Sequence, residues 1–95
     1  MILEVAQVRV LDGSHDDFVD ALRTAATTVL PQAQGFLGFE AHGWCVERPD
    51  VFMFTIRWNT LEDHTVGFRG GELFTQWRQL IGPFFAEPPH VEHFG

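Results

Sequence analysis

The sequence is poor in several chemically useful residues, and each scarcity excludes a class of protein. It has one cysteine, Cys45, which cannot form an internal disulfide, so a disulfide-stapled secreted scaffold is excluded. The only serine, Ser14, stands where a helix cap explains it, which effectively excludes a serine-triad hydrolase. No Gly-rich phosphate loop, Cys-x-x-Cys pair or His-Glu-x-x-His motif occurs. Tyrosine is absent altogether.

Positive charge is also scarce. Six basic residues stand against thirteen acidic ones, which gives a formal net charge of −7. The basic residues are all arginines and are widely spaced: Arg9, Arg23, Arg48, Arg57, Arg69 and Arg78. Nucleic acids and anionic membranes need clustered basic side chains, so neither is expected as a partner. No basic leader region and no apolar run near the ~18 residues of a membrane span is visible, so we expect a soluble, cytoplasmic protein.

The sequence is rich in large apolar residues. Its 95 residues are 45% hydrophobic, with ten Phe and three Trp, which excludes a disordered chain. The length suits one domain over residues 1–95, without a repeat or a linker that would divide it. Because so small a domain buries only roughly 60–65% of its unfolded surface, it gains much stability from a partner.

Hydrophobic periodicity predicts seven elements. In chain order, they are a strand over 2–10, a helix after Ser14, an irregular strand over 36–47, a clear strand over 51–58, a short helix from Thr60 to about Phe68, a helix carrying Leu73 to Ile81, and an extended strand from Phe85 to Phe94. Gly38 and Gly43 mark bulges in the second strand. Ser14 with Asp17, and Thr60 with Asp63, have the spacing of a capping box.

This element order, β-α-β-β-α-α-β, predicts an α+β, ferredoxin-like plait: an antiparallel sheet with helices on one face. The other face would be open to water. The strand over 51–58 nevertheless carries Val51 and Met53 on the side opposite Phe54 and Ile56. An antiparallel sheet with one wet face alternates more cleanly. We therefore expect a homodimer in which a second copy covers the sheet face.

The histidines differ in what their positions imply. His64 falls on the same helix face as Leu61 and Phe68, the face that should point inward. It is either a hydrogen-bonded core histidine or a pocket base or donor, because imidazole titrates near neutral pH. His90 and His93 lie three apart on the last strand and face opposite sides, so we expect no metal site there.

The aromatic residues allow two interpretations. Trp58 ends the apolar row of its strand and Trp77 is central to the apolar stripe of its helix. Most such residues serve core packing, but aromatics between a sheet and helices also line pockets for flat ligands. Arg57, Asn59 and Arg78 are the nearby polar groups that could bind a phenolate or carboxylate.

Several segments together resemble one family. They are Arg57-Trp58-Asn59-Thr60-Leu61-Glu62-Asp63-His64-Thr65, Gly67-Phe68-Arg69-Gly70, Trp77-Arg78, Pro83-Phe84-Phe85 and Val91-Glu92-His93-Phe94. With Ile2 to Ala6 and Gly35 to Gly38, they resemble the antibiotic biosynthesis monooxygenase (ABM) domain family. The resemblance implies a dimeric α+β barrel with a pocket in each subunit between helices and sheet. It also implies a monooxygenase that oxygenates small aromatics, phenols or hydroquinones, without metal, flavin or haem.

The resemblance assigns residues to this site. Trp58 would wall the pocket, His64 would be base or donor, and Asn59 or Arg78 would hold the oxyanion. The substrate would be bound by Phe54, Ile56, Phe68 and Trp77. Characterised quinone-forming members use a tyrosine that this chain lacks, so a non-catalytic dimeric module for a small ligand or for stress sensing is the alternative. The haem-degrading branch of the same superfamily has an axial histidine about ten residues after the tryptophan that ends the strand. Here the tenth residue after Trp58 is Phe68, so a haem binder is disfavoured.

Overall fold

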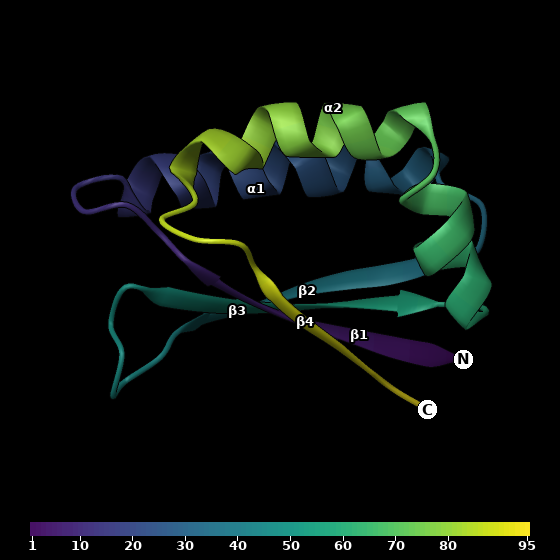
Figure 1. The fold of residues 1–95 in the computed structure, drawn as a ribbon, viewed down its shortest axis with the longest axis horizontal. Helices are drawn as coiled ribbons and strands as arrows, with labels where there is room; N and C mark the ends of the chain where they lie inside the picture. Colours follow the sequence, from purple (N-terminus) through teal and green to yellow (C-terminus); the bar gives the residue numbers. More distant parts are fainter.

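Four antiparallel strands form one sheet in the order β2-β3-β1-β4. The computed structural model describes residues 1–95 (Figure 1). The strands are β1 (Ile2–Arg9), β2 (Phe36–Trp44), β3 (Val51–Trp58) and β4 (His90–Phe94). The helices are α1 (His15–Thr28), the 3₁₀ turn η1 (Leu30–Gln32), the π-helix η2 (Asp63–Phe68), α2 (Glu72–Ile81) and the 3₁₀ turn η3 (Gly82–Phe84). This is the predicted ferredoxin-like plait.

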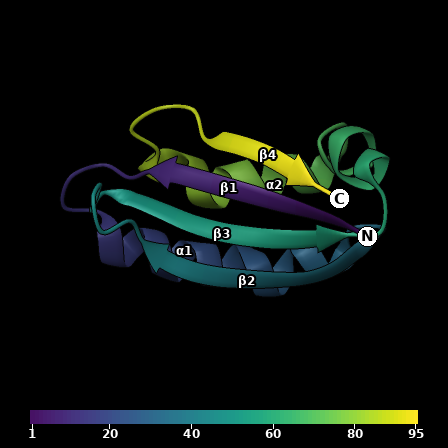
Figure 2. The same cartoon turned by 90° about the horizontal axis from the view of Figure 1, so that it is seen from below.

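Both long helices cover the same face of the sheet. Figure 1 shows α1 and α2 on one side of the strands, and Figure 2 shows the opposite face, which no helix covers. None of the helices could span a membrane, since the longest, α1, has 14 residues. The single protomer leaves the sheet face opposite α1 and α2 uncovered (Figure 2), as the element order predicted.

The alternation of the two central strands places one hydrophobic core between sheet and helices. Seventeen buried residues form this core. On β3, the row that includes Phe54, Ile56 and Trp58 faces it, and on β1 Ala6 and Val8 do. The apolar stripe of α1 and that of α2 pack against these rows, because both helices repeat their apolar residues at 3.6-residue spacing.

The edge strands depart from regular pairing. The register of β2 with β3 shifts between Phe36 and Gly38 and again between Ala41 and Gly43, which confirms the two bulges. The last strand is shorter than expected, because it begins at His90 and not at Phe85. Two prolines precede His90 and have no N–H to donate to a ladder, and Phe85 makes only an isolated bridge to Val10, just after β1.

Only one of the two predicted capping boxes forms. Backbone N of Thr60 donates to Asp63 Oδ2 at 3.2 Å, and backbone N of Asp63 donates to Thr60 Oγ1 at 3.1 Å. Ser14 caps α1 without a side-chain hydrogen bond, so the predicted box with Asp17 is wrong. The box caps the helical turn that begins at Leu61 and leads into η2. It also requires Gly35, whose φ is +81° and where a Cβ would collide with the Asp63 carboxylate.

Candidate functional site

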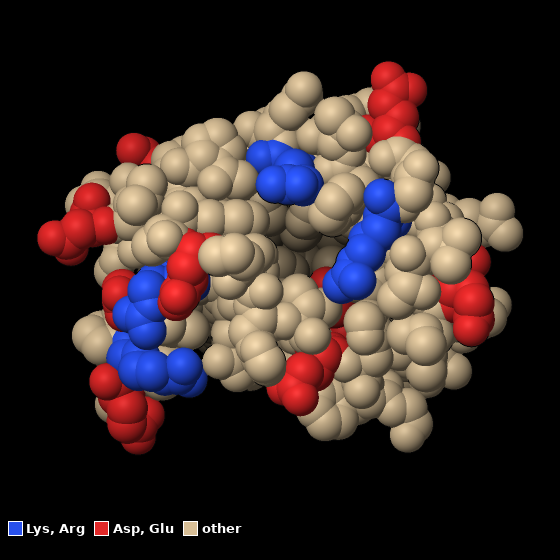
Figure 3. Space-filling view, in the orientation of Figure 1, with Lys and Arg blue, Asp and Glu red and all other residues tan.

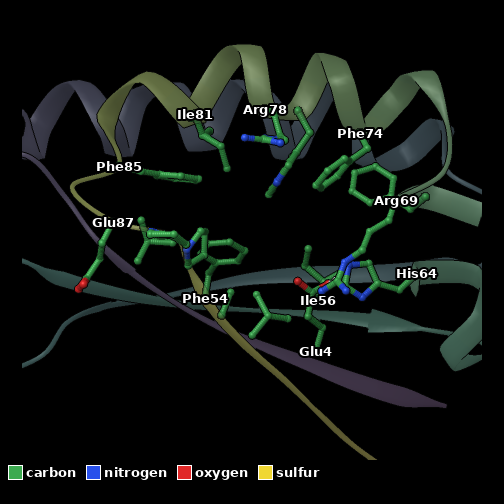
Figure 4. A pocket seen from close by; sticks show the side chains of 18 residues that line it. Glu4, Phe54, Ile56, His64, Arg69, Phe74, Arg78, Ile81, Phe85 and Glu87 are labelled. Carbon is green, nitrogen blue, oxygen red and sulfur yellow. Dashed lines mark ion pairs between the residues drawn. The ribbon is translucent and has the colours of Figure 1, made fainter. Parts of the chain in front are cut away.

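A cavity of about 620 Å³ lies between the sheet and α2. Ten of its eighteen lining residues are hydrophobic, and the polar minority is concentrated in a few charged groups. Figure 3 shows the mouth as a hollow with basic side chains on either side of it, and Figure 4 shows the side chains that line it. A mostly apolar hollow with a few polar groups is typical of small-molecule sites.

The structure brings six of the eight predicted site residues to this cavity. The expected substrate-binding residues all line it: Phe54, Ile56, Phe68 and Trp77. His64 and Arg78 line it as well. Trp58 and Asn59 are not among the lining residues. The sequence pattern thus located the pocket, although it did not separate the lining residues from those just behind them.

Trp58 acts from behind the pocket surface. Its side chain is fully buried, and its ring is stacked on His64 with centroids 5.2 Å apart and planes at 13°. Its Nε1–H donates to Glu4 Oε1 at 2.9 Å. Trp58 therefore orients two polar groups of the pocket without lining it. Asn59, by contrast, is exposed, and its backbone N–H donates to the carbonyl of Gly35.

Glu4 is a site residue that the sequence pattern did not single out. It is only 5% exposed and lines the cavity from β1. The alternation of the strand indicates that Glu4 faces inward, because it shares one side of the strand with Ile2, Ala6 and Val8. A carboxylate within an apolar, inward-facing row is costly to bury unless a function or a partner retains it.

His64 is buried in a small polar cluster that three elements assemble. It is 3% exposed and lies on η2, and its Nε2 is 3.3 Å from Glu4 Oε1 (Figure 4). Its Nδ1 is 2.7 Å from Nε2 of His93, which pairs with Glu4 across the β1–β4 ladder.

Phe68 is the neighbour of His64 on the helix face, as predicted, but Leu61 is 38% exposed. Leu61 precedes the π-helix, whose wider turns re-aim the residues that follow.

Burial dominates the electrostatics of this cluster. Desolvation raises the pKa of Glu4 above its usual value, although the Trp58 hydrogen bond and the charge of Arg69 oppose the shift. Desolvation and the charge of the nearby Arg69 together lower the pKa of His64 to about 3. The pKa of His93 is lowered for the same two reasons. Both histidines are thus neutral at pH 7.

Two arginines stand at the cavity without an acidic partner. Arg69 and Arg78 both line it, and neither forms an ion pair, whereas Arg9 and Arg23 do. Arg78 lies 5.9 Å above the ring of Phe74, and Arg69 reaches toward Glu4 and His64 in Figure 4. In a chain of net charge −7, this places free positive charge where a ligand would enter. Such groups can stabilise an anion.

No group of three or more His, Cys, Asp or Glu side chains is arranged to hold a metal ion. His90 and His93 face opposite sides of β4, as predicted: His90 contacts Glu92 and His93 contacts His64.

The fold and the cavity define a ferredoxin-like α+β domain with a small-molecule pocket between sheet and helices. The sequence model of the antibiotic biosynthesis monooxygenase family matches residues 1–80. The chain belongs to this family, as the sequence resemblance indicated. Membership supports a monooxygenase-like, small-molecule-binding function.

Individual relatives agree with this assignment. The chain is 36% identical over 96 residues to the uncharacterized Bacillus subtilis protein YczJ, covering 99% of this chain and 97% of that one. A crystal structure from Bordetella bronchiseptica that bears the family's name is 34% identical, with a TM-score of 0.93 over 99% of this chain and 94% of that one. A Nitrosomonas europaea structure is 18% identical, with a TM-score of 0.77 over 100% and 97% of the two chains, which supports the fold alone.

Proposed function

We propose that this protein is a cofactor-independent monooxygenase that acts on a small phenol- or hydroquinone-like aromatic in the cavity. The observation that carries the proposal is the combination of an apolar cavity of about 620 Å³ with a buried acid–base cluster in its wall. Phe54 of β3 and Trp77 of α2 meet edge to face, with ring centroids 6.0 Å apart, and together give a flat ring an apolar wall to pack against. The family assignment supports the reaction class.

The proposed reaction begins with loss of the substrate's hydroxyl proton to the cluster of Glu4 and His64. The resulting anion is electron-rich enough to reduce O₂ itself. One oxygen atom replaces a ring hydrogen and becomes a carbonyl, and the other leaves as water with the hydrogens from the hydroxyl group and the ring carbon. No metal, flavin or haem takes part in this scheme.

The protein's contribution would be orientation and charge stabilisation. Arg78, which lines the cavity from α2, would hold the substrate oxyanion, with Arg69 as a second cation nearby. Asn59 would contribute only from outside the cavity, since it is not a lining residue. Trp58 would fix the plane of His64 by stacking. Ile56 and Phe68 would complete the apolar wall.

The activity is tested by oxygen consumption with a panel of phenols and hydroquinones. We expect turnover that persists with chelators and falls by about 10²–10⁴-fold in His64→Ala, the usual contribution of a positioned acid–base group. His90→Ala is the matched control, because His90 is exposed on the outer side of β4 and should leave the rate unchanged. If no compound is oxidised but an aromatic raises the melting temperature, the non-catalytic binding module is favoured.

We also propose that a second copy of the chain covers the open sheet face. Val5 and Met53 are half-buried on that face, and Phe94 and Leu37 are 55% and 51% exposed at its edges in the single protomer. Covering such apolar area is favourable by roughly 25 cal/mol per Å². A two-fold dimer covers the same face of both copies at once.

Light scattering at micromolar concentration tests this arrangement. We expect a particle of about twice the chain mass of 10.8 kDa. Met53→Glu should shift the particle toward the monomer, because it places a charge at the centre of the covered face. A wild-type particle near 10.8 kDa would exclude the dimer.

A further inference from the structure

Both ring nitrogens of His64 are already engaged within the protein. Nδ1 lies 2.7 Å from His93 Nε2, and Nε2 lies 3.3 Å from Glu4 Oε1. The ring itself is stacked on Trp58. A substrate hydroxyl can therefore not reach a free nitrogen of His64 without displacing one of these partners. This constrains which atom of the cluster can accept a proton from the cavity.

Glu4 has one carboxylate oxygen engaged and one free. Oε1 accepts the Trp58 Nε1–H at 2.9 Å and is also the oxygen beside His64. Oε2 makes no hydrogen bond within the protein, and it is not among the fully buried atoms that lack a partner. Because Glu4 lines the cavity, this second oxygen is the one that a bound molecule can reach.

We propose that Glu4 Oε2 is the proton acceptor of the pocket, and that His64 and His93 are positioning residues that hold the carboxylate. This inference rests on the proposed function and names the acceptor atom within it. In the step itself, the substrate O–H bond breaks, its electron pair stays on the substrate oxygen, and the proton forms an O–H bond to Oε2. Glu4 changes from carboxylate to carboxylic acid.

The donors around Glu4 set the proton arrangement. The Trp58 indole can only donate, so Oε1 is an acceptor. With a proton on Nε2, His64 offers a second donor to Oε1. Its Nδ1 is then unprotonated and accepts from His93 Nε2–H. His93 thereby selects the His64 tautomer, as a hydrogen bond to one ring nitrogen commonly does for the other.

Burial favours this arrangement, whereas the charge of Arg69 opposes the rise in the pKa of Glu4. His93 faces the cluster from β4 and Arg69 from the end of η2, and Trp58 faces it from β3. From α2, Arg78 lines the same cavity. Burial raises the pKa of Glu4, which makes its carboxylate a stronger base than an exposed one. The lowered pKa of His64 keeps it a neutral donor.

Nuclear magnetic resonance of the substrate-free protein tests the proton arrangement directly. We expect the ¹⁵N shifts of His64 at pH 7 to show a proton on Nε2 and none on Nδ1. The ¹³Cδ signal of Glu4 should titrate above the ordinary 4.5. The opposite tautomer, with Nδ1 protonated and Nε2 bare, would mean that Glu4 donates to His64, and the proposal would be wrong.

Variants separate the acceptor from its positioning residues. His93→Phe should turn the single His64 tautomer into a mixture, because Nδ1 loses its donor; an unchanged tautomer would remove His93 from the proposal. Glu4→Gln should keep the Trp58 hydrogen bond through its amide oxygen and lower oxidation by about 10²–10⁴-fold. The matched control is Glu72→Gln, on the exposed first turn of α2.

The two proposals fail in different ways. If no phenol is oxidised by the wild type, the proposed function fails, and the tautomer of His64 still reports whether Glu4 is a carboxylate that accepts a hydrogen bond from His64. If the wild type oxidises a phenol and Glu4→Gln does so at an undiminished rate, the acceptor role of Glu4 is refuted and the activity stands.

Discussion

Replacing Trp58 with alanine is expected to lower the free energy of unfolding by about 3–5 kcal/mol, the range for large aromatic residues in cores. Trp58 is fully buried, and its ring contacts Phe36, His64 and Phe68. The substitution leaves a void and removes the indole donor of Glu4. Urea unfolding at fixed protein concentration measures the effect.

Trp58→Phe separates these two contributions. Phenylalanine keeps most of the apolar contact but offers no N–H to Glu4 Oε1. The buried carboxylate then loses a partner, which costs about 1–3 kcal/mol. We expect Trp58→Phe to be less damaging than Trp58→Ala. If both variants were equally destabilised, the hydrogen bond would be responsible and the packing would not; if both were neutral, the burial of Trp58 would be irrelevant to stability.

The second large effect is a loss of stability in acid. His64 has a pKa of about 3 when folded and about 6.5 when unfolded, so the unfolded state binds a proton that the folded state excludes. The stabilisation is complete above pH 6.5 and is lost as the pH falls toward 3. Over that whole window it amounts to about 5 kcal/mol, at 1.36 kcal/mol per pKa unit.

Glu4 acts in the opposite direction. Its folded pKa is raised above 4.5, so the folded state binds the proton more readily. The stability from Glu4 therefore falls as the pH rises from 4.5 through the folded pKa. Upon acidification, protonation of Glu4 therefore restores part of the stability that is lost through His64. Urea unfolding at pH 7.5 and pH 4 should show a clear net decrease in the wild type and a much smaller one in His64→Gln. His90→Gln, at an exposed histidine, should behave as wild type, and an equal decrease in all three proteins would exclude His64 as the cause.

The sequence was informative wherever one residue pattern had one structural meaning. The alternation of β3 placed Phe54 and Ile56 on the pocket face, and helical spacing did so for Phe68 and Trp77. Thr60 with Asp63 forms its capping box because the two residues are local to each other. Fold and apolar lining are thus set by short-range periodicity.

The polar chemistry was less predictable because it depends on contacts between distant segments. Glu4 meets Trp58 and His64 across 54 and 60 positions of the chain, and no spacing rule links them. His93 joins them only through the β1–β4 register. Whether a side chain lines the cavity or lies behind its wall depends on how far it reaches, which the sequence pattern does not give. Trp58 was therefore expected at the pocket surface, although it lies behind it.

The place of β1 in the centre of the sheet has a consequence for how the chain must fold. Glu4 is paired with Ile56 on one side and with His93 on the other. Since side chains alternate between the two faces, sliding β1 by a single residue along its neighbours would turn the carboxylate out to the helix-free surface. Correct alignment of the three strands and assembly of the acid–base group are therefore one event, and a misaligned chain would lack the proton acceptor altogether.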